Sequence, residues 1–235
     1  MGRATALDIV ASVAEGLGLV KPSDIFTTTD NNVIQLRTLF NNAGQELEKA
    51  FNWQYLQKEY TFQTVASQAE YDLPSDYSRM VSDSQWDRTD RWPMIGPKNS
   101  VEWQALKGSN FVSGPRYRWR IWGDKIHIYP TPGADVATIA FEYMSNGWLK
   151  KVDNSYVDKA SANDDLCLHD SLLMNSFLKF QFLDTKGLDA TSARDEYLRI
   201  YNLITGHDGA ASILCMDRSR RGQLLSTGNV PEGSW

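Results

Sequence analysis

The sequence has few of the residues from which metal centres, disulfide frameworks and catalytic sites are built. It contains two cysteines, Cys167 and Cys215, and three histidines among 235 residues. Two cysteines without a C-x-x-C spacing make no disulfide framework in a chain of this length, so we expect unpaired thiols in a reducing compartment. Cys167 and His169 have no second pair of ligands, so we predict no metal site and place His169 in the core or at an interface.

Apolar runs and an excess of basic residues are also missing. No stretch approaches the roughly 20 apolar residues of a membrane span, and Asp8 and Glu15 interrupt the apolar N-terminal segment. The net charge is −5, whereas dedicated nucleic-acid binders are usually basic. We therefore expect a protein that is made in the cytosol, has no membrane partner and is not a dedicated nucleic-acid binder.

Motifs of common enzyme classes are absent from the sequence. It contains no G-x-x-x-x-G-K-[ST], no G-x-G-x-x-G after a strand, no G-x-S-x-G and no H-E-x-x-H. Mid-chain aspartates leave a carbohydrate hydrolase as one alternative, although aspartates in turns usually serve turn geometry: Asp72, Asp76, Asp87 and Asp90. We predict that the chain is not an enzyme and has no catalytic residue and no cofactor.

Helical periodicity begins the chain. One helix is expected from Thr5 to about Leu17, and a second follows a cap at Thr29 or Asp30. The apolar stripe of the second helix comprises Val33, Leu36, Phe40, Ala43, Leu47 and Ala50. Its polar face is expected in solvent or between subunits, and it carries Arg37, Gln45, Glu48 and Lys49.

The middle of the chain changes to the two-residue period of strands. The stretch "EYTFQTVASQAEYDLP" predicts a strand, a turn at 66–68 and a second strand that ends at Pro74. Residues 75–98 are expected to form a long, charged and irregular loop. A short helical pattern follows at 99–108 and stops at Gly108.

The stretch "RYRWRIWGDKIHIYP", residues 116–130, predicts a hairpin around Gly123-Asp124. Glycine in the first central place indicates a type II′ turn, which pairs Trp122 with Lys125 and Arg118 with Tyr129. This register gathers one apolar face from Tyr117, Trp119, Ile121, Ile126 and Ile128. It gathers a cationic outer face from Arg118, Arg120, Trp122, Lys125, His127 and Tyr129. The later strand "VATIAFEYM" adds Ile139, Phe141 and Tyr143 to the buried side.

Helical patterns return before the chain loses its periodicity. One helix is expected from a cap at Asn163 or Asp164 to about Gly187, and another from Asp189 to Gly206. The patterns together predict an α+β fold, in which a helical bundle at 5–57 and 163–206 carries a β-rich insert with an antiparallel hairpin at 58–150. We expect one domain over 1–206 and an extended C-terminal tail over 207–235.

Four stretches, followed by the closing helix pair, carry a family resemblance: "NNAGQELEKAFNWQYLQKEYTFQT", "YDLPSDYSRM", "YRWRIWGDKIHIYPTPGA" and "AFEYMSNGW". They resemble the head-to-tail connector (adaptor) proteins of tailed bacteriophages, most of all the tail tubular protein A type of short-tailed phages. The likeness spans roughly residues 30–206. It implies a non-enzymatic virion protein with a helical bundle and a β-rich portion.

The resemblance also implies where the protein acts and what it binds. Members of that family form rings, commonly of twelve copies, in the neck between the capsid portal and the tail. The implied partners are the portal protein, a downstream tail nozzle or tail-tube protein and further copies of the chain. DNA is contacted without sequence preference in the lumen.

Two sets of candidate contact residues follow from the resemblance. C-terminal segments of such connectors often reach into the portal, so we expect portal docking by Ile213, Leu214, Arg218, Arg220, Arg221, Leu224, Leu225 and Trp235. Contacts to neighbouring subunits or to the tail component are expected from Arg118, Arg120, Lys125, His127, Trp86, Arg88 and Trp92. The alternative is a nucleic-acid-binding module that uses the basic aromatic hairpin 116–130.

Overall fold

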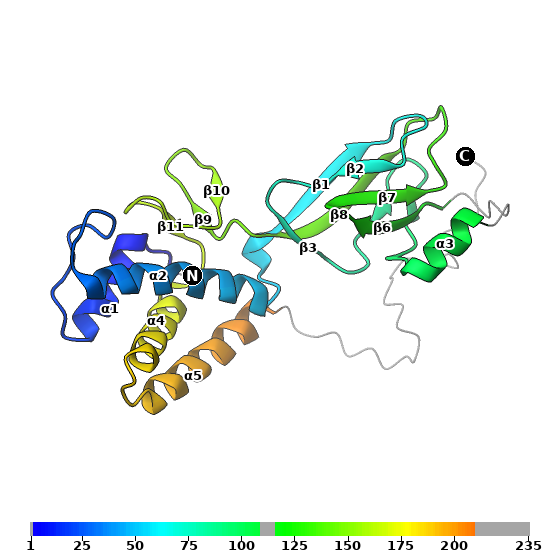
Figure 1. Cartoon of the computed structure of the whole chain (residues 1–235). Helices are drawn as coiled ribbons and strands as arrows, with labels where there is room; N and C mark the ends of the chain where they lie inside the picture. The colour runs from blue at the N-terminus through cyan, green and yellow to red at the C-terminus, as the bar shows by residue number, and fades with distance from the viewer. Residues whose placement is uncertain (1, 109–115, 210–235) are drawn as a thin grey trace.

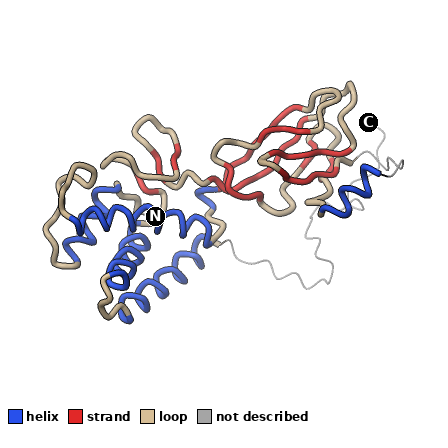
Figure 2. Tube along the Cα trace, viewed as in Figure 1, coloured by secondary structure: helices blue, strands red, loops and turns tan. Residues whose placement is uncertain are grey.

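Two clusters of buried apolar side chains organise an α+β fold, one among helices and one between two sheets. The computed structural model describes residues 2–108 and 116–209 (Figure 1). The helices α1, α2, α4 and α5 lie at one end of an elongated molecule, and most strands lie at the other end together with α3 (Figures 1 and 2). The predicted fold class is therefore confirmed.

The first two helices form where their caps predict. Helix α1 spans Ala6–Gly16, and Thr5 and Asp8 build a reciprocal capping box at its start. Helix α2 spans Asn31–Ala50, and the carboxylate of Asp30 accepts a hydrogen bond from the backbone N–H of Asn32 at 2.8 Å. The predicted stripe of α2 is buried except at its end, where Ala50 is exposed.

The closing helices are α4, Ser171–Thr185, and α5, Thr191–Asp208. The predicted start of α4 at Asn163 or Asp164 is wrong, because Asp170 is the cap. The residues before it form a tight loop and a strand: the carboxylate of Asp165 accepts hydrogen bonds from the backbone of residues 161 and 162. Polar residues that resemble a helix cap therefore hold a turn here.

The four helices bury a shared core that includes two tryptophans. Trp53 and Trp148 are fully buried, and the ring of Trp148 meets Phe40 of α2 edge-on at 5.2 Å. A small sheet in the order β10-β9-β11 lies beside the helices, built from Leu149–Lys150 (β9), Tyr156–Val157 (β10) and Leu166–Cys167 (β11). Helices from both ends of the chain thus form one bundle, as predicted.

The β-rich part consists of two antiparallel sheets that share one core. The larger sheet comprises β1 (Gln57–Gln63), β3 (Tyr77–Met80), β4 (Trp86–Asp87), β5 (Trp92–Pro93) and β8 (Thr138–Ser145). The smaller sheet comprises β2 (Glu70–Asp72), β6 (Arg118–Trp122) and β7 (Lys125–Tyr129). A short turn of 3₁₀ helix, η1 (Gln54–Leu56), leads from the bundle into β1. The segment at 75–98, predicted to be an irregular loop, contains three short strands, β3, β4 and β5. Strands β3 and β4 both form because they pair with β8.

The hairpin β6–β7 has the predicted register, with Trp122 opposite Lys125 and Arg118 opposite Tyr129. The predicted turn type is wrong, because both Gly123 (φ 57°) and Asp124 (φ 59°) have positive φ. Two positive φ angles define a type I′ turn, which has the same two-residue length and so gives the same register.

The predicted strand at 136–144 exists as β8, but it belongs to the larger sheet rather than beside the hairpin. Its residues Ile139, Phe141 and Tyr143 face the hairpin residues Trp119, Ile126 and Ile128 across the core. The burial of these side chains was predicted correctly, because a two-residue period shows which face is buried. It does not show which strands pair.

Candidate interaction surfaces

The described chain leaves the bundle at the junction with the β-rich part. The carboxylate of Asp208 accepts a hydrogen bond from the backbone N–H of Gln54 at 2.9 Å, directly before β1. Gly209 follows and donates its N–H to the carbonyl oxygen of Thr205. Helix α5 thus continues two residues beyond its predicted end at Gly206. The predicted portal-docking residues, 213–235, lie outside the described residues.

An arginine of β3 fixes the end of α2 to the larger sheet. The guanidinium of Arg79 lies 2.9 Å from the carboxylate of Glu48 and donates to the carbonyl oxygens of Glu48 and Phe51. Glu48 is only 2% exposed within the subunit, so its predicted place on a face in solvent or between subunits is wrong. A buried carboxylate needs a partner, and Arg79 supplies it from another element.

The aspartates considered for hydrolysis have structural contacts. Asp76 accepts hydrogen bonds from Lys58 at 2.6 Å, from Tyr143 at 2.8 Å and from Ser145 at 2.8 Å. Burial raises its pKa, but these three hydrogen bonds outweigh burial, and its pKa lies below the ordinary value. Asp87 accepts from two backbone N–H groups of its own turn, those of residues 89 and 90. These carboxylates hold backbone and side chains in place.

Helix α3, Ser100–Gly108, covers part of the predicted cationic face of the hairpin. The buried ring of Trp103 packs against the rings of His127 and Tyr129, and His127 is only 8% exposed. Nε2 of His127 lies 3.0 Å from the carbonyl oxygen of Trp122. The ring of Trp122 stacks on His127 and remains 58% exposed. The outer face therefore does not present a continuous stacking platform for bases.

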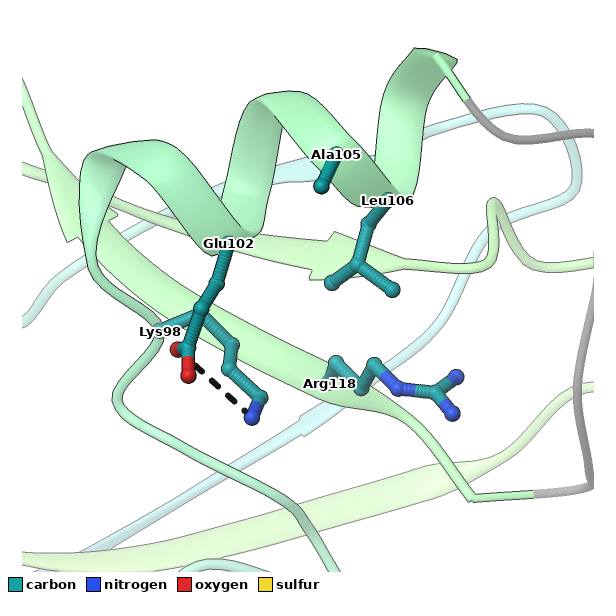
Figure 3. A pocket seen from close by; sticks show the side chains of 5 residues that line it. All are labelled: Lys98, Glu102, Ala105, Leu106 and Arg118. Atoms are coloured by element: carbon teal, nitrogen blue, oxygen red, sulfur yellow. Dashed lines mark ion pairs between the residues drawn. The ribbon is translucent and has the colours of Figure 1, made fainter.

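The cations of the hairpin remain at the margin of α3. Arg120 donates to the hydroxyl of Ser100 at 2.9 Å, and Lys125 lies 3.5 Å from the carboxylate of Asp72. Arg118 lines a shallow cavity of about 320 Å³ between β6 and α3, together with Lys98, Glu102, Ala105 and Leu106 (Figure 3). Lys98 and Glu102 form an ion pair at 3.6 Å at the edge of this cavity.

The structure divides the remaining predicted contact residues between two places. The guanidinium of Arg116 lies over the ring of Trp92 in β5, 4.6 Å from the centre of that ring. Trp92 therefore lies beside the hairpin. Trp86 pairs with Ala140 on the outer side of the larger sheet, and Arg88 lies 2.8 Å from Glu59 there. The predicted set is therefore not one surface.

The outer side of the larger sheet was not identified from the sequence. Glu59 of β1 stands directly opposite Glu142 of β8, and the side chains of Gln57, Thr61 and Gln63 are also exposed there. The polar residues alternate in "QKEYTFQ", so the period of β1 could have shown this face. Its partner strand could not be read from the sequence, and the opposition of the two glutamates depends on that partner.

His169 lies in the core, as predicted. Its Nδ1 lies 2.7 Å from the hydroxyl of Tyr55 and its Nε2 3.2 Å from the carbonyl oxygen of Gly44. Burial lowers the pKa of His169 to about 4 and raises the pKa of Cys167 to about 12, so both side chains are neutral at pH 7. Within residues 2–108 and 116–209, no three His, Cys, Asp or Glu side chains gather as metal ligands would. None of the described helices is long and apolar enough to cross a membrane.

Comparison with known families identifies a family to which the chain is similar. The model of a family described as SU10 adaptor protein matches residues 4–222. The matched range includes every helix and strand described above, from α1 to α5. No curated protein matches the chain.

Proposed function

The chain belongs to the SU10 adaptor protein family, a family of bacteriophage adaptors, and from this premise we propose that its copies form a ring that joins the portal protein to the tail. A phage adaptor is a structural protein of the virion neck, which binds portal and tail components. The proposal adds a closed ring, twelve copies in it, and a lumen through which DNA passes. The observation that carries it is the family match over 4–222.

A ring requires each subunit to present two different side faces, because each copy contacts the next through a heterologous interface. The elongated subunit, with a helical bundle at one end and two packed sheets at the other, offers such faces along its length (Figure 1). The hairpin residues Arg118, Arg120, Lys125 and His127, with Trp86, Arg88 and Trp92, are proposed to contact neighbouring subunits or the tail nozzle or tail tube. The net charge of −5 disfavours tight binding of DNA in the lumen.

The segment after α5 is proposed to dock on the portal. We take residues 1–206 as one adaptor domain and the segment 207–235 as the docking tail, whose first two residues still belong to α5. The tail combines two short apolar stretches with a basic group, which suits a segment that orders on a partner: Ile213, Leu214, Arg218, Arg220, Arg221, Leu224, Leu225 and Trp235. Its exit beside Gln54 supports this assignment, since the segment leaves the subunit at the junction rather than inside the bundle.

Deletion of residues 210–235 tests the docking segment and keeps the contact between Asp208 and Gln54 intact. We expect the shortened chain to melt at the temperature of the full chain and to form the same ring, but to lose co-purification with the portal protein. A triple substitution of Arg218, Arg220 and Arg221 by alanine is the milder variant and should weaken portal binding without abolishing folding. Undiminished portal binding by the shortened chain would contradict the assignment.

A further inference from the structure

The β-rich part has two outer faces that point away from each other, because the inner faces of its two sheets share one core. The first face belongs to the larger sheet and carries Glu59, Glu142 and, in the adjoining turn, Asp83. We call it the acidic face. Ser84 of that turn donates to the carbonyl oxygen of Glu142 through its hydroxyl, which places the turn beside the strand. Glu59 and Asp83 are exposed and Glu142 is half-buried.

Within the described part of the chain, the acidic face carries more carboxylates than paired cations. Glu59 and Glu142 are direct cross-strand partners, and like charges in such positions destabilise a sheet. Among the described residues, one cation on this face forms an ion pair with these carboxylates: Arg88 lies 2.8 Å from Glu59. The carboxylate of Glu142 accepts a hydrogen bond from the neutral side chain of Gln57. A cationic partner would relieve this repulsion.

The second outer face lies on the smaller sheet, and its part formed by α3 and β6, with the residues directly before each, is what we call the basic face. The described residues of the basic face include five cations: Lys98, Lys107, Arg116, Arg118 and Arg120. Among the described residues of this part, the carboxylate is Glu102, which pairs with Lys98 (Figure 3). The carboxylates Glu70 and Asp72 lie on β2 at the other edge of the smaller sheet, where Asp72 is 3.5 Å from Lys125. The segment 109–115 that connects α3 to the hairpin contains no charged residue, so it does not change this balance. Val101 of α3 is 79% exposed and adds an apolar side chain to the basic face.

We propose that the acidic face of one copy docks on the basic face of the next copy around the ring. This inference rests on the proposed ring. A heterologous contact joins two different faces that are complementary to each other. The acidic and basic faces are of opposite charge and lie on opposite sides of the subunit, and neither is complementary to itself. Complementary charge also fixes the orientation in which copies meet and excludes pairing of two like faces.

DNA is the other polyanion that a basic face can bind. A DNA site would explain the cations of α3 and β6, but it would leave the acidic face and the exposed Val101 unexplained. A second copy of the chain accounts for both charged faces and for an apolar side chain among the cations. We therefore assign the basic face to the neighbouring subunit.

Charge reversal of each face in the full chain tests the proposal. One variant carries Glu59→Lys and Glu142→Lys, and the other carries Arg116→Glu and Arg120→Glu. All four side chains are exposed or half-buried, and unfolding curves show whether each variant folds. Assembly is followed by sedimentation and native mass, alone and with portal protein. Each variant by itself should assemble at least about tenfold more weakly than the unchanged chain. A Lys159→Glu chain, altered at an exposed residue of the helical end, is the control and should assemble normally.

A mixture of the two reversed variants gives the decisive result. Each reversed face then meets an oppositely reversed face, so the mixture should recover assembly as rings in which the two variants alternate. Normal assembly of either folded variant alone, or a mixture that fails to recover, would overturn the inference and leave the ring itself standing. Loss of DNA binding by the Arg116→Glu/Arg120→Glu chain with unchanged assembly would also overturn it, in favour of DNA. Failure of the unchanged chain to assemble, even with portal protein, would instead contradict the proposed function.

Discussion

At the scale of single residues, the bundle depends on a tight contact between Gly44 of α2 and the indole of Trp148. A Cβ atom at Gly44 would lie 2.2 Å from a ring atom of Trp148, far inside contact distance. The carbonyl oxygen of the same glycine lies 3.2 Å from Nε2 of His169. One position without a side chain therefore lets a tryptophan and a histidine pack against the middle of a helix.

The substitution Gly44→Ala should lower the free energy of unfolding by about 1–3 kcal/mol, because Trp148 has no space into which it can move. Urea unfolding measures the change. Gly16→Ala at the end of α1 is the matched control, because nothing lies within 4 Å of its added Cβ. It should leave stability unchanged or raise it by up to about 1 kcal/mol. Equal effects of the two substitutions would contradict the assigned contact.

His169 predicts a pH dependence of stability with a definite sign. Burial lowers its pKa to about 4 in the fold from the ordinary 6.5, so the unfolded chain binds the proton more readily. The free energy of unfolding should therefore fall as the pH drops from about 6.5 to 4, by an amount on the order of 3 kcal/mol. Urea titrations across this range measure the slope. A His169→Gln chain should be less stable at pH 7 and show a shallower slope, and an unchanged slope would refute the assignment.

At the scale of elements, Arg79 connects β3 to the last turn of α2. Its guanidinium pairs with the buried carboxylate of Glu48 and with two carbonyl oxygens at the end of the helix. Orphan carbonyl groups at a helix C-terminus need donors, and a sheet residue provides them here. This contact couples the helical end of the molecule to the β-rich end.

Arg79→Met should destabilise the fold by about 3 kcal/mol, near the low end for a broken buried ion pair because Arg79 keeps some contact with solvent. The double substitution Arg79→Met with Glu48→Gln removes the unpaired charge and should recover part of the loss. Thermal unfolding of the single and double variants gives the comparison. A double variant that is less stable by the sum of the two single effects would argue against direct coupling.

The elements show which features a sequence can predict. The register of β6–β7 followed from a two-residue loop and an alternating pattern, both of which are local. The type of turn did not, because Gly123 fits either primed turn and only the φ angle of Asp124 distinguishes them. The burial of Glu48 and the pairing of β8 depend on Arg79 and β1, which are distant in sequence.

The candidate surfaces divide in the same way. The cations of "RYRWRIW" were visible as an alternating pattern, whereas their partial cover by Trp103 depends on how α3 folds back. The opposition of Glu59 and Glu142 became visible only with the pairing of β1 and β8. Local patterns thus predicted which residues share a face, and tertiary contacts decided what each face meets.

At the scale of the whole molecule, the helical bundle, the sheet sandwich and the start of the C-terminal segment meet at one junction. Asp208, Gln54 and Arg79 all lie there, so the segment proposed to bind the portal begins where the two parts are joined. The charged faces lie further out on the β-rich end. This arrangement assigns portal docking and subunit contacts to different regions. Substitutions in the docking tail should therefore leave the contacts between subunits intact, and substitutions in the charged faces should leave the portal-docking segment intact.

The most direct test of the account is the native mass of the complex that the full chain forms with purified portal protein. We predict one ring of twelve copies on each portal ring, and no such complex from the chain that lacks residues 210–235. A chain that stays monomeric beside the portal, or that binds it in isolated copies without closing a ring, would contradict the central claim.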